Sequence, residues 1–217
     1  MDVLEAIRER RSSRAFLAKP VEKEKIETLI GLAANAPSAI NMQPWEIVVV
    51  SGEEKNRLSR LLVKRMRERR ISCGPGAQKP LPPHFVERQR GLLRCILPNL
   101  KPVDTPFEDF VNEGSCNFYG APAALIITLD RAFSSARYTD IGIITGYLVL
   151  AAHAISLGTC PIGLITAFEE EIQEQLSLSE EKQVVIGIAL GYPDPRSPLN
   201  RARSERAELG EFVKWRE

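Results

Sequence analysis

Three short runs of aliphatic and β-branched residues constrain the fold of this 217-residue chain most strongly. They cover residues 45–50 (WEIVVV), 123–129 (AALIITL) and 184–190 (VVIGIAL). Runs of this length and composition are typical of buried strands. Because segments with helical apolar spacing separate them, we expect one domain, or one domain with an elaboration, that combines helices with a sheet.

The segments between the predicted strands show helical periodicity. We expect helices near residues 3–10, 26–34, 55–70, 140–157 and 168–176. The helix at 140–157 is almost entirely apolar, and we expect Gly158 to end it. Its apolar stretch is shorter than the ~20 residues that span a bilayer, so we interpret it as a buried central helix. Residues 75–106 hold seven of the fifteen prolines and are expected to form an elaboration or lid.

Charge and cysteine usage narrow the classes of function. The formal net charge is +1, which gives no electrostatic argument for a nucleic-acid or membrane partner. The basic segment 55–70 has no interleaved aromatic residue, so a solvated helix face is favoured over nucleic-acid binding. The four cysteines lack the spacing of zinc ligands, so we predict no metal site and free thiols in a reducing cytoplasm. The acidic start does not resemble a signal peptide.

Sequence motifs for side-chain chemistry are sparse. The chain has no dinucleotide-binding fingerprint, no Walker A motif and no nucleophile elbow. Its two histidines are His84 and His153, and His153 falls within the apolar helix, where we expect a core residue with its polar atoms satisfied. Any reaction is therefore expected to belong to a bound cofactor.

The first of three polar motifs is RRSSR at residues 10–14. If the chain is extended there, Arg10, Ser12 and Arg14 project to one side, because side chains alternate along a strand. Two guanidinium groups and a hydroxyl on one face suit a phosphate group, whose oxygens match the planar donors of arginine. A solvated cationic patch is the alternative interpretation.

The second motif is the loop APSAINMQPW at residues 36–45. If this loop is extended, Asn41 and Gln43 share a face, and their amides offer donors and acceptors to the edge of a heteroaromatic ring. The alternative is a connecting loop built from turn-forming residues.

The third motif is GTCPIG at residues 158–163, after the apolar helix. Gly163 has no side chain, so backbone N–H groups can approach a ligand closely there. The alternative is a helix cap.

Together these motifs resemble those of the FMN-dependent nitroreductase family. The segments RRSSRAF, APSAINMQPWEIVVV, YTDIG, LAAHAISLGTCPIG and GYPDPRSPLNRARSERAELGEF occur in the family's order and spacing. The SERAEL tail and the long middle insertion resemble the nitrobenzoate-reductase-like branch. The resemblance implies an α+β fold, a three-layer α-β-α sandwich with a central mixed, mainly antiparallel sheet. It implies one FMN-binding domain over residues 1–217, with a variable lid or insertion at about 71–116 and a C-terminal arm at about 199–217.

The resemblance also implies a set of FMN-binding positions. These are Arg10, Arg11, Ser12, Arg14, Pro37, Ser38, Asn41, Gln43, Pro161, Ile162, Gly163, Arg203 and Arg206. The arginines and Ser12 would hold the phosphate and ribityl chain, and the motif at 36–45 would line the ribityl chain and the pyrimidine edge. The motif at 158–163 would pack on the flavin, with the amide of Gly163 or of Leu164 directed at N5. No side chain is expected to be catalytic.

The implied function is a ping-pong oxidoreductase. NADPH or NADH would supply a hydride, and a nitroaromatic, a quinone or a similar electron-poor small molecule would accept it. The candidates for the acceptor side of the cleft are Phe107, Phe110, Phe118 and Tyr119, with core packing as the alternative. The resemblance further implies a homodimer with FMN at the subunit interface, in which Phe212 and Trp215 belong to an arm that wraps the partner.

Two alternative functions remain open at this point. One keeps the fold and FMN but changes the reaction to reductive dehalogenation, enoate reduction or flavin cleavage. The other is a non-catalytic protein that stores or senses FMN, favoured if the proline-rich insertion closes the cleft.

Overall fold

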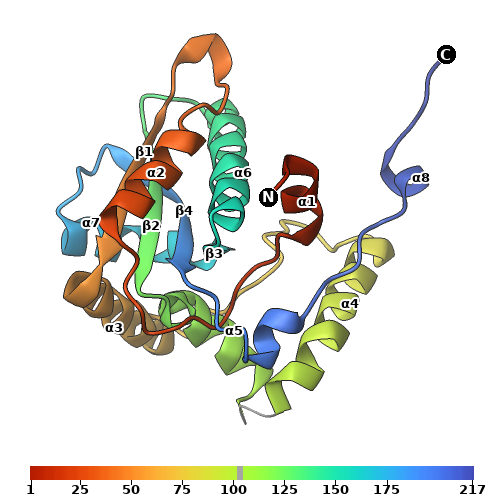
Figure 1. Cartoon of the computed structure of the whole chain (residues 1–217), viewed down its shortest axis with the longest axis horizontal. Helices are drawn as coiled ribbons and strands as arrows, with labels where there is room; N and C mark the ends of the chain where they lie inside the picture. The colour runs from red at the N-terminus through yellow and green to blue at the C-terminus, as the bar shows by residue number, and fades with distance from the viewer. Residues whose placement is uncertain (102–104) are drawn as a thin grey trace.

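A four-stranded antiparallel sheet organises the chain in the computed structural model, which describes residues 1–101 and 105–217 (Figure 1). Its strands are β1 (Trp45–Ser51), β2 (Ala123–Asp130), β3 (Gly158–Ile162) and β4 (Lys182–Gly191). They lie in the order β1-β2-β4-β3, and each neighbouring pair is antiparallel. An isolated parallel bridge between Ser12 and Thr159 adds the parallel component.

The composition of β2 explains why the sheet is covered on both faces. Ala124 and Ile126 belong to one hydrophobic core, whereas Leu125 and Ile127 belong to the other. Successive strand residues point to opposite faces, so a run with apolar residues at both parities needs a layer of helices on each side. The three-layer α-β-α sandwich confirms the predicted fold class.

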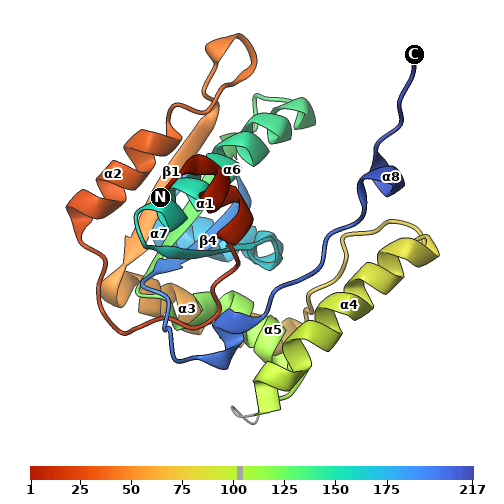
Figure 2. The same ribbon diagram turned by 45° about the vertical axis from the view of Figure 1, so that its right-hand side comes forward.

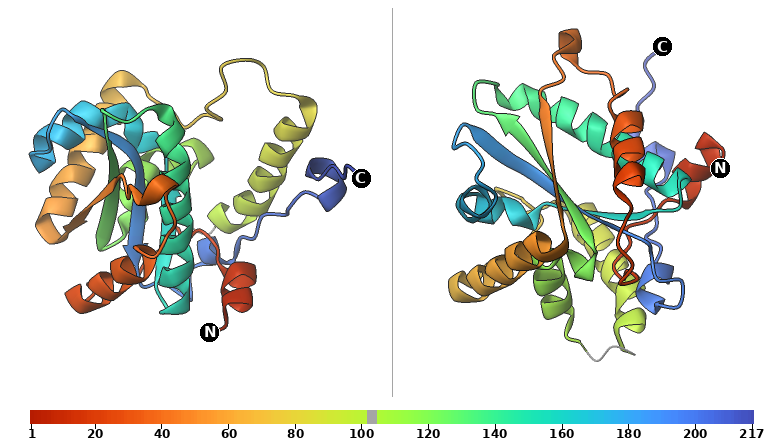
Figure 3. Two further views of the ribbon diagram at one scale, coloured as in Figure 1. Left: turned by 90° about the horizontal axis from the view of Figure 1, so that it is seen from above. Right: turned by 60° about the vertical axis from the view of Figure 1, so that its left-hand side comes forward.

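The two outer layers are built from different parts of the chain (Figure 3). The core on one face is formed with α2 (Lys23–Ala33) and α6 (Tyr138–Ala154). The core on the other face is formed with α3 (Gly52–Arg69), α5 (Phe107–Cys116) and α7 (Glu169–Leu176). The other helical elements are α1 (Val3–Glu9), η1 (Ala39–Asn41), α4 (Pro83–Leu100), η3 (Phe118–Gly120), η4 (Ser135–Arg137), η5 (Leu164–Phe168), η6 (Pro198–Arg201) and α8 (Leu209–Phe212).

The end of α6 differs from the prediction. The helix stops at Ala154, and Ser156 takes the left-handed backbone conformation, with φ of 64°, that often follows a helix C-terminus. Gly158 is therefore the first residue of β3 and does not end the helix. The third polar motif is a strand, so the helix-cap interpretation was wrong.

Helix α4 and the C-terminal tail lie to one side of the sandwich (Figures 1 and 2). Ile96 and Leu100, in the second half of α4, form a small core with Phe110, whereas Phe85 near the start of the helix is exposed. The tail runs beside α4, where Arg88 forms an ion pair with Glu211 at 3.0 Å. Beyond that contact the chain extends away from the body.

The basic segment at 55–70 lies within α3 except for Arg70, which follows the helix, and carboxylates from outside the segment offset its charge. Arg60 pairs with Glu53, and Arg67 pairs with Glu113 of α5. Arg69 pairs with Glu171 of α7. This arrangement is that of a solvated, ion-paired helix face. In the described parts of the chain, no helix combines the length and the apolar character needed to cross a membrane.

Packing beside β3 gives a first testable prediction. Gly187 of β4 pairs with Ile162, and a Cβ at position 187 would lie 2.4 Å from Cδ1 of Ile165. We expect Gly187→Ala to lower the free energy of unfolding by about 1–3 kcal/mol, because the close-packed core must move to admit the methyl group. Urea denaturation measures this loss.

Two further variants separate this clash from a general effect of replacing glycine. Ile165→Val removes the clashing methyl, so the double variant should recover part of the loss. Gly142→Ala lies on α6 with no neighbouring atom within 4 Å of the added carbon, so it should raise the free energy of unfolding by about 0.5–1 kcal/mol. A Gly187→Ala protein as stable as the wild type would show that Ile165 does not pack tightly against position 187.

Candidate functional site

Two neighbouring cavities share Arg14 and Leu92 in their walls. The first has a volume of about 370 Å³ and lies between the segment after α1, α4 and the tail. The second, about 560 Å³, lies between α4, α5 and the loop after β3. The first is rich in arginine and the second is largely apolar, so the two neighbouring cavities suit a ligand with an anionic end and a flat, less polar end.

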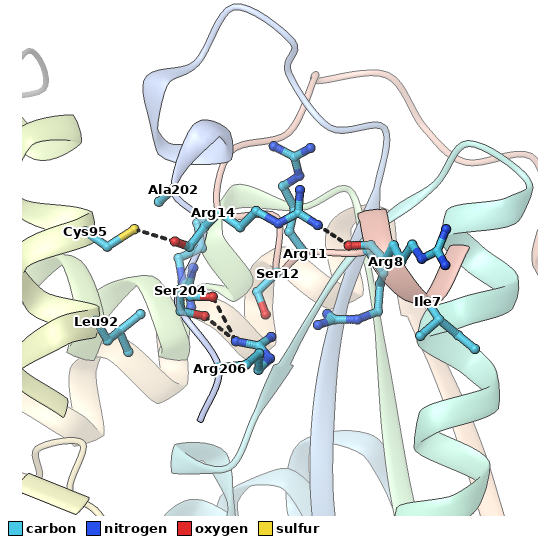
Figure 4. Close-up of a pocket in the computed structure, with 12 residues that line it drawn as sticks. Ile7, Arg8, Arg11, Ser12, Arg14, Leu92, Cys95, Ala202, Ser204 and Arg206 are labelled. Atoms are coloured by element: carbon cyan, nitrogen blue, oxygen red, sulfur yellow. Dashed lines mark hydrogen bonds between the residues drawn. The ribbon is translucent and has the colours of Figure 1, made fainter. Parts of the chain in front are cut away.

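The first cavity collects arginines from both ends of the chain (Figure 4). Ser12 forms a bridge with Thr159 of β3, and the N–H of Ser13 donates to the carbonyl of Thr159 at 2.8 Å. Ser12 therefore faces the cavity, whereas Ser13 is buried against Gly158, where a Cβ would lie 2.5 Å from its Oγ. This is the alternation predicted for the first motif. The arginines of the wall are Arg8, Arg10, Arg11, Arg14, Arg203 and Arg206.

Asn200 joins the tail to the first motif. Its Oδ1 accepts a hydrogen bond from the backbone N–H of Arg14 at 2.8 Å, and its Nδ2 donates to the carbonyl of Ala15 at 2.8 Å. The Arg11 side chain donates to the backbone carbonyl of Asn200 at 3.1 Å. Sequence reasoning missed this residue. Its one signal was a turn-forming residue beside Pro198 in a basic tail.

The charge of the first cavity is largely unbalanced. In the described residues, the wall arginines form ion pairs only through Glu9, which lies 3.9 Å from Arg11 and 3.4 Å from Arg203. Burial lowers the pKa of Arg10, and the positive charge of Arg206 lowers it further. Both causes disfavour the cationic form of Arg10, and no Asp or Glu of the described residues forms an ion pair with it. The cavity is therefore suited to bind an anion.

The second cavity is lined mainly by apolar and aromatic residues. Pro161, Ile162 and Gly163 form one wall, and a Cβ at Gly163 would meet no atom within 4 Å. Phe107 and Tyr119 also line this cavity. Of the four aromatic candidates, Phe110 and Phe118 are instead buried in hydrophobic cores.

Tyr119 is held in place by an unusual local structure. Phe118 and Tyr119 have φ of 56° and 52°, which is strained for residues that carry a side chain. The ring lies over Gly114, where a Cβ would be 2.6 Å from Cε1 of the tyrosine. It also packs against Phe110 with a centroid separation of 5.5 Å. The backbone conformation of Tyr119 and the absence of a side chain at Gly114 thus fix the position of the ring in the cavity wall.

The second polar motif lines neither cavity. Ile40, Asn41 and Gln43 have positive φ of 47°, 59° and 46°, so the loop is a tight turn and the extended conformation considered for it was wrong. The amides still meet, because Nε2 of Gln43 donates to Oδ1 of Asn41 at 3.2 Å. Ser38 Oγ accepts from the N–H of Gln43 at 2.9 Å. Pro37 belongs to the same loop.

This loop and the first cavity lie at opposite ends of α6. The N–H of Ala39 donates to Asp140 in the first turn of α6 at 3.3 Å. The bridge between Ser12 and Thr159 follows the other end of the helix. The 17 residues of α6 span about 25 Å, which is longer than an extended mononucleotide. Within one chain, the loop at residues 36–45 is therefore far from the arginines of the first cavity (Figures 1 and 3).

Comparison with known proteins identifies the family. Residues 7–192 match the family model described as "Nitroreductase family". The chain belongs to the nitroreductase family. It is 34% identical to a 4-nitrobenzoate reductase of Pseudomonas putida over 201 residues, which cover 91% of this chain and 88% of that protein. It is 30% identical to a chloronitrobenzene nitroreductase of Comamonas testosteroni, over 95% of this chain and 93% of that protein.

A solved structure supports the same assignment to the nitroreductase family. The FMN-dependent nitroreductase NfnB from Mycobacterium smegmatis, in complex with NADPH, is similar with a TM-score of 0.87 and 28% identity. The similarity covers 99% of this chain and 97% of that one. It spans the sheet, both helical layers and the tail, and so confirms that the chain has the nitroreductase fold.

Two further groups in this nitroreductase bear on the earlier expectations. Nε2 of His153 is buried without a hydrogen-bond partner in the described residues, so the expectation of a satisfied core histidine was wrong. Burial lowers the pKa of His153, and the charges of Arg11 and Arg10 lower it further. Cys73, Cys95, Cys116 and Cys160 are free thiols, and the described residues contain no cluster of metal-ligand type.

Proposed function

We propose that this chain binds FMN across the two neighbouring cavities and uses NADPH or NADH to reduce nitroaromatic, quinone or similar electron-poor small molecules. One observation carries the proposal: an arginine-rich cavity and an apolar cavity beside β3 share Arg14 and Leu92 in their walls. The similarity to an FMN-dependent nitroreductase and to a 4-nitrobenzoate reductase supports the same assignment.

The residues around the first cavity fit the phosphate end of FMN. Arg10, Arg14 and Arg206 would hold the phosphate with Ser12, and Arg11 and Arg203 would add charge around it. The unbalanced charge at Arg10 is the structural sign of this fit, because a bound phosphate would supply the missing negative charge.

The residues around the second cavity fit the flavin ring. Pro161 and Ile162 would pack against it, and the open space at Gly163 would let the backbone N–H of Gly163 or Leu164 approach it. When bound, FMN supplies the hydride transfer from the nicotinamide nucleotide to the acceptor. The protein's own part is to orient the ring, to exclude water with apolar walls, and to place a fixed N–H dipole where negative charge develops.

We also propose a homodimer with FMN at the interface. Pro37, Ser38, Asn41 and Gln43 line neither cavity of their own chain, and the length of α6 separates them from the first one. In a two-fold symmetric pair, the same loop of a second copy can complete each site. Ile40, at the tip of this loop, is 90% exposed and has a strained backbone, as expected of a residue that packs against a partner.

Exposed apolar side chains on other elements support the dimer. Leu4 and Ile7 of α1 and Tyr147 of α6 are each exposed by about half, and Phe212 and Trp215 of the tail are more exposed still. Association would bury them at about 25 cal/mol per Å². The tail would then be the arm that wraps the partner.

The insertion, the domain boundaries and the cellular location complete the proposal. We assign residues 1–217 to one domain, with a lid or insertion at about 71–116 in which α4 covers the apolar cavity. The C-terminal arm begins at about 199.

A cytoplasmic location is supported by the four free thiols. Reductive dehalogenation and enoate reduction are tested as alternative reactions with the same flavin-loaded protein.

The absorbance spectrum of the purified protein tests the cofactor. We expect a yellow solution with flavin bands and, after extraction and reconstitution, one FMN per chain. A colourless protein that does not bind added FMN would contradict the proposal. A yellow protein whose flavin is not reduced by NADPH or NADH would instead support the alternative of a non-catalytic FMN-binding protein.

A further inference from the structure

The apolar cavity contains charged groups of one sign only. Its lining includes Arg14 and Arg90, and no Asp or Glu of the described residues contributes to it. The remaining wall is mostly aliphatic and aromatic, with Leu93 and Ile96 of α4 and Phe107 of α5 among its members. A flat apolar ligand that carries a negative charge matches this lining.

The two arginines belong to different parts of the space. Arg14 also lines the first cavity, and Asn200 holds its backbone beside the other arginines. Arg90 lies on α4 and does not line the first cavity. A phosphate bound in the first cavity therefore leaves Arg90 as a separate cation on the lid side of the apolar cavity.

The guanidinium of Arg90 is available for a ligand. Its side chain is 67% exposed, and its ion pair with Glu87 has an N–O distance of 3.6 Å. Glu87 has a closer partner in Arg94, at 2.8 Å. Surface pairs of this kind contribute little, whereas a guanidinium offers two parallel donors to a carboxylate.

We propose that Arg90 binds the carboxylate of aromatic acceptors and gives this enzyme a preference for nitrobenzoate-like substrates over neutral nitroaromatics. The inference rests on the proposed function and adds a substrate class to it. The names of the relatives do not decide this point, because they include a reductase of 4-nitrobenzoate, which is anionic, and one of chloronitrobenzene, which is neutral.

Two variants on one helix test the proposal with opposite expected signs. Arg90→Gln removes the cation and should lower the ratio of kcat/KM for 4-nitrobenzoate to kcat/KM for nitrobenzene about five- to ten-fold. Glu87→Gln removes the competing carboxylate and should raise the same ratio about two-fold. If the substitutions merely disturbed the structure of α4, this ratio would shift in the same direction in both variants.

Calorimetry with ligands that cannot be reduced gives a readout besides activity. The flavin-loaded protein is titrated with benzoate and with benzamide, its neutral counterpart. Arg90→Gln should weaken benzoate binding about five- to ten-fold, with a smaller effect on benzamide, and should reduce the dependence of benzoate binding on salt.

Three results would overturn the proposal. The first is an equal loss for benzoate and benzamide, and the second is a shift of the kcat/KM ratio in the same direction in both variants. The third is an effect of Arg90→Gln confined to kcat/KM for NADPH and absent with NADH, which would assign Arg90 to the nucleotide's phosphate. Failure of the wild-type protein to reduce any nitroaromatic or quinone would contradict the proposed function, while the two titrations would still test Arg90.

Discussion

Replacing Arg10 with glutamine is expected to raise the dissociation constant of FMN about ten- to a hundred-fold. Arg10 lines the first cavity, and its charge lacks a paired carboxylate in the described residues. A hydrogen bond between charged groups contributes about 1.5–3 kcal/mol, which corresponds to this range. Fluorescence titration of the apoprotein with FMN measures the constant.

Replacing Arg10 with glutamine should not lower the stability of the apoprotein. Burial and the charge of Arg206 both disfavour the cationic form of Arg10, so its removal should leave the melting temperature of the apoprotein unchanged or higher. Arg57→Gln is the matched control, because Arg57 is an exposed residue of α3 paired with Glu54 and lies outside both cavities. FMN affinity equal in the two variants would exclude Arg10 from the phosphate site.

Deleting residues 209–217 is expected to convert the proposed dimer to a monomer that retains FMN weakly. The segment carries Leu209, Phe212 and Trp215, which are 70%, 63% and 85% exposed in the single chain. Burial of each in an interface contributes roughly 1.5–3 kcal/mol, so their loss should raise the dimer dissociation constant about a thousand-fold or more. FMN is lost as well, because each proposed site needs a loop of the second copy.

Light scattering together with the flavin-to-protein absorbance ratio measures both effects. Glu211→Gln is the control, since it breaks the ion pair between the tail and Arg88 but keeps the apolar side chains. It should remain a flavin-loaded dimer. A truncated protein that is still a dimer with a full complement of FMN would refute the role given to the arm.

Local sequence patterns predicted the central part of the fold. The runs at 45–50, 123–129 and 184–190 became β1, β2 and β4, each extended by one to three residues. β2 and β4 are largely buried, but β1 is an edge strand in which only Val50 is buried, so the expectation of a buried strand was wrong there. Its β-branched residue types still carried the signal. β3 was not predicted, because it is a short edge strand that contains Pro161. Its extended conformation comes from pairing with β4 and with Ser12, which residue spacing does not reveal.

The candidate site could be predicted from the sequence where its side chains alternate along an extended chain. Ser12 and Ser13 point to opposite sides, as an extended chain requires. The left-handed conformation of Ile40 and Gln43 has no such signature, because their side chains strongly disfavour it. The meeting of Arg206 with Arg10 is a contact between the two ends of the chain, which the family resemblance implied and the local pattern did not.

Reduction of the bound flavin by a nicotinamide nucleotide tests the central claim most directly. The flavin-loaded protein is mixed anaerobically with NADPH or with NADH in a stopped-flow spectrometer, and the flavin absorbance is followed before and after a nitroaromatic is added. We predict rapid bleaching with at least one nucleotide and recovery of the absorbance with the acceptor. A bound flavin that neither NADPH nor NADH bleaches would contradict the account.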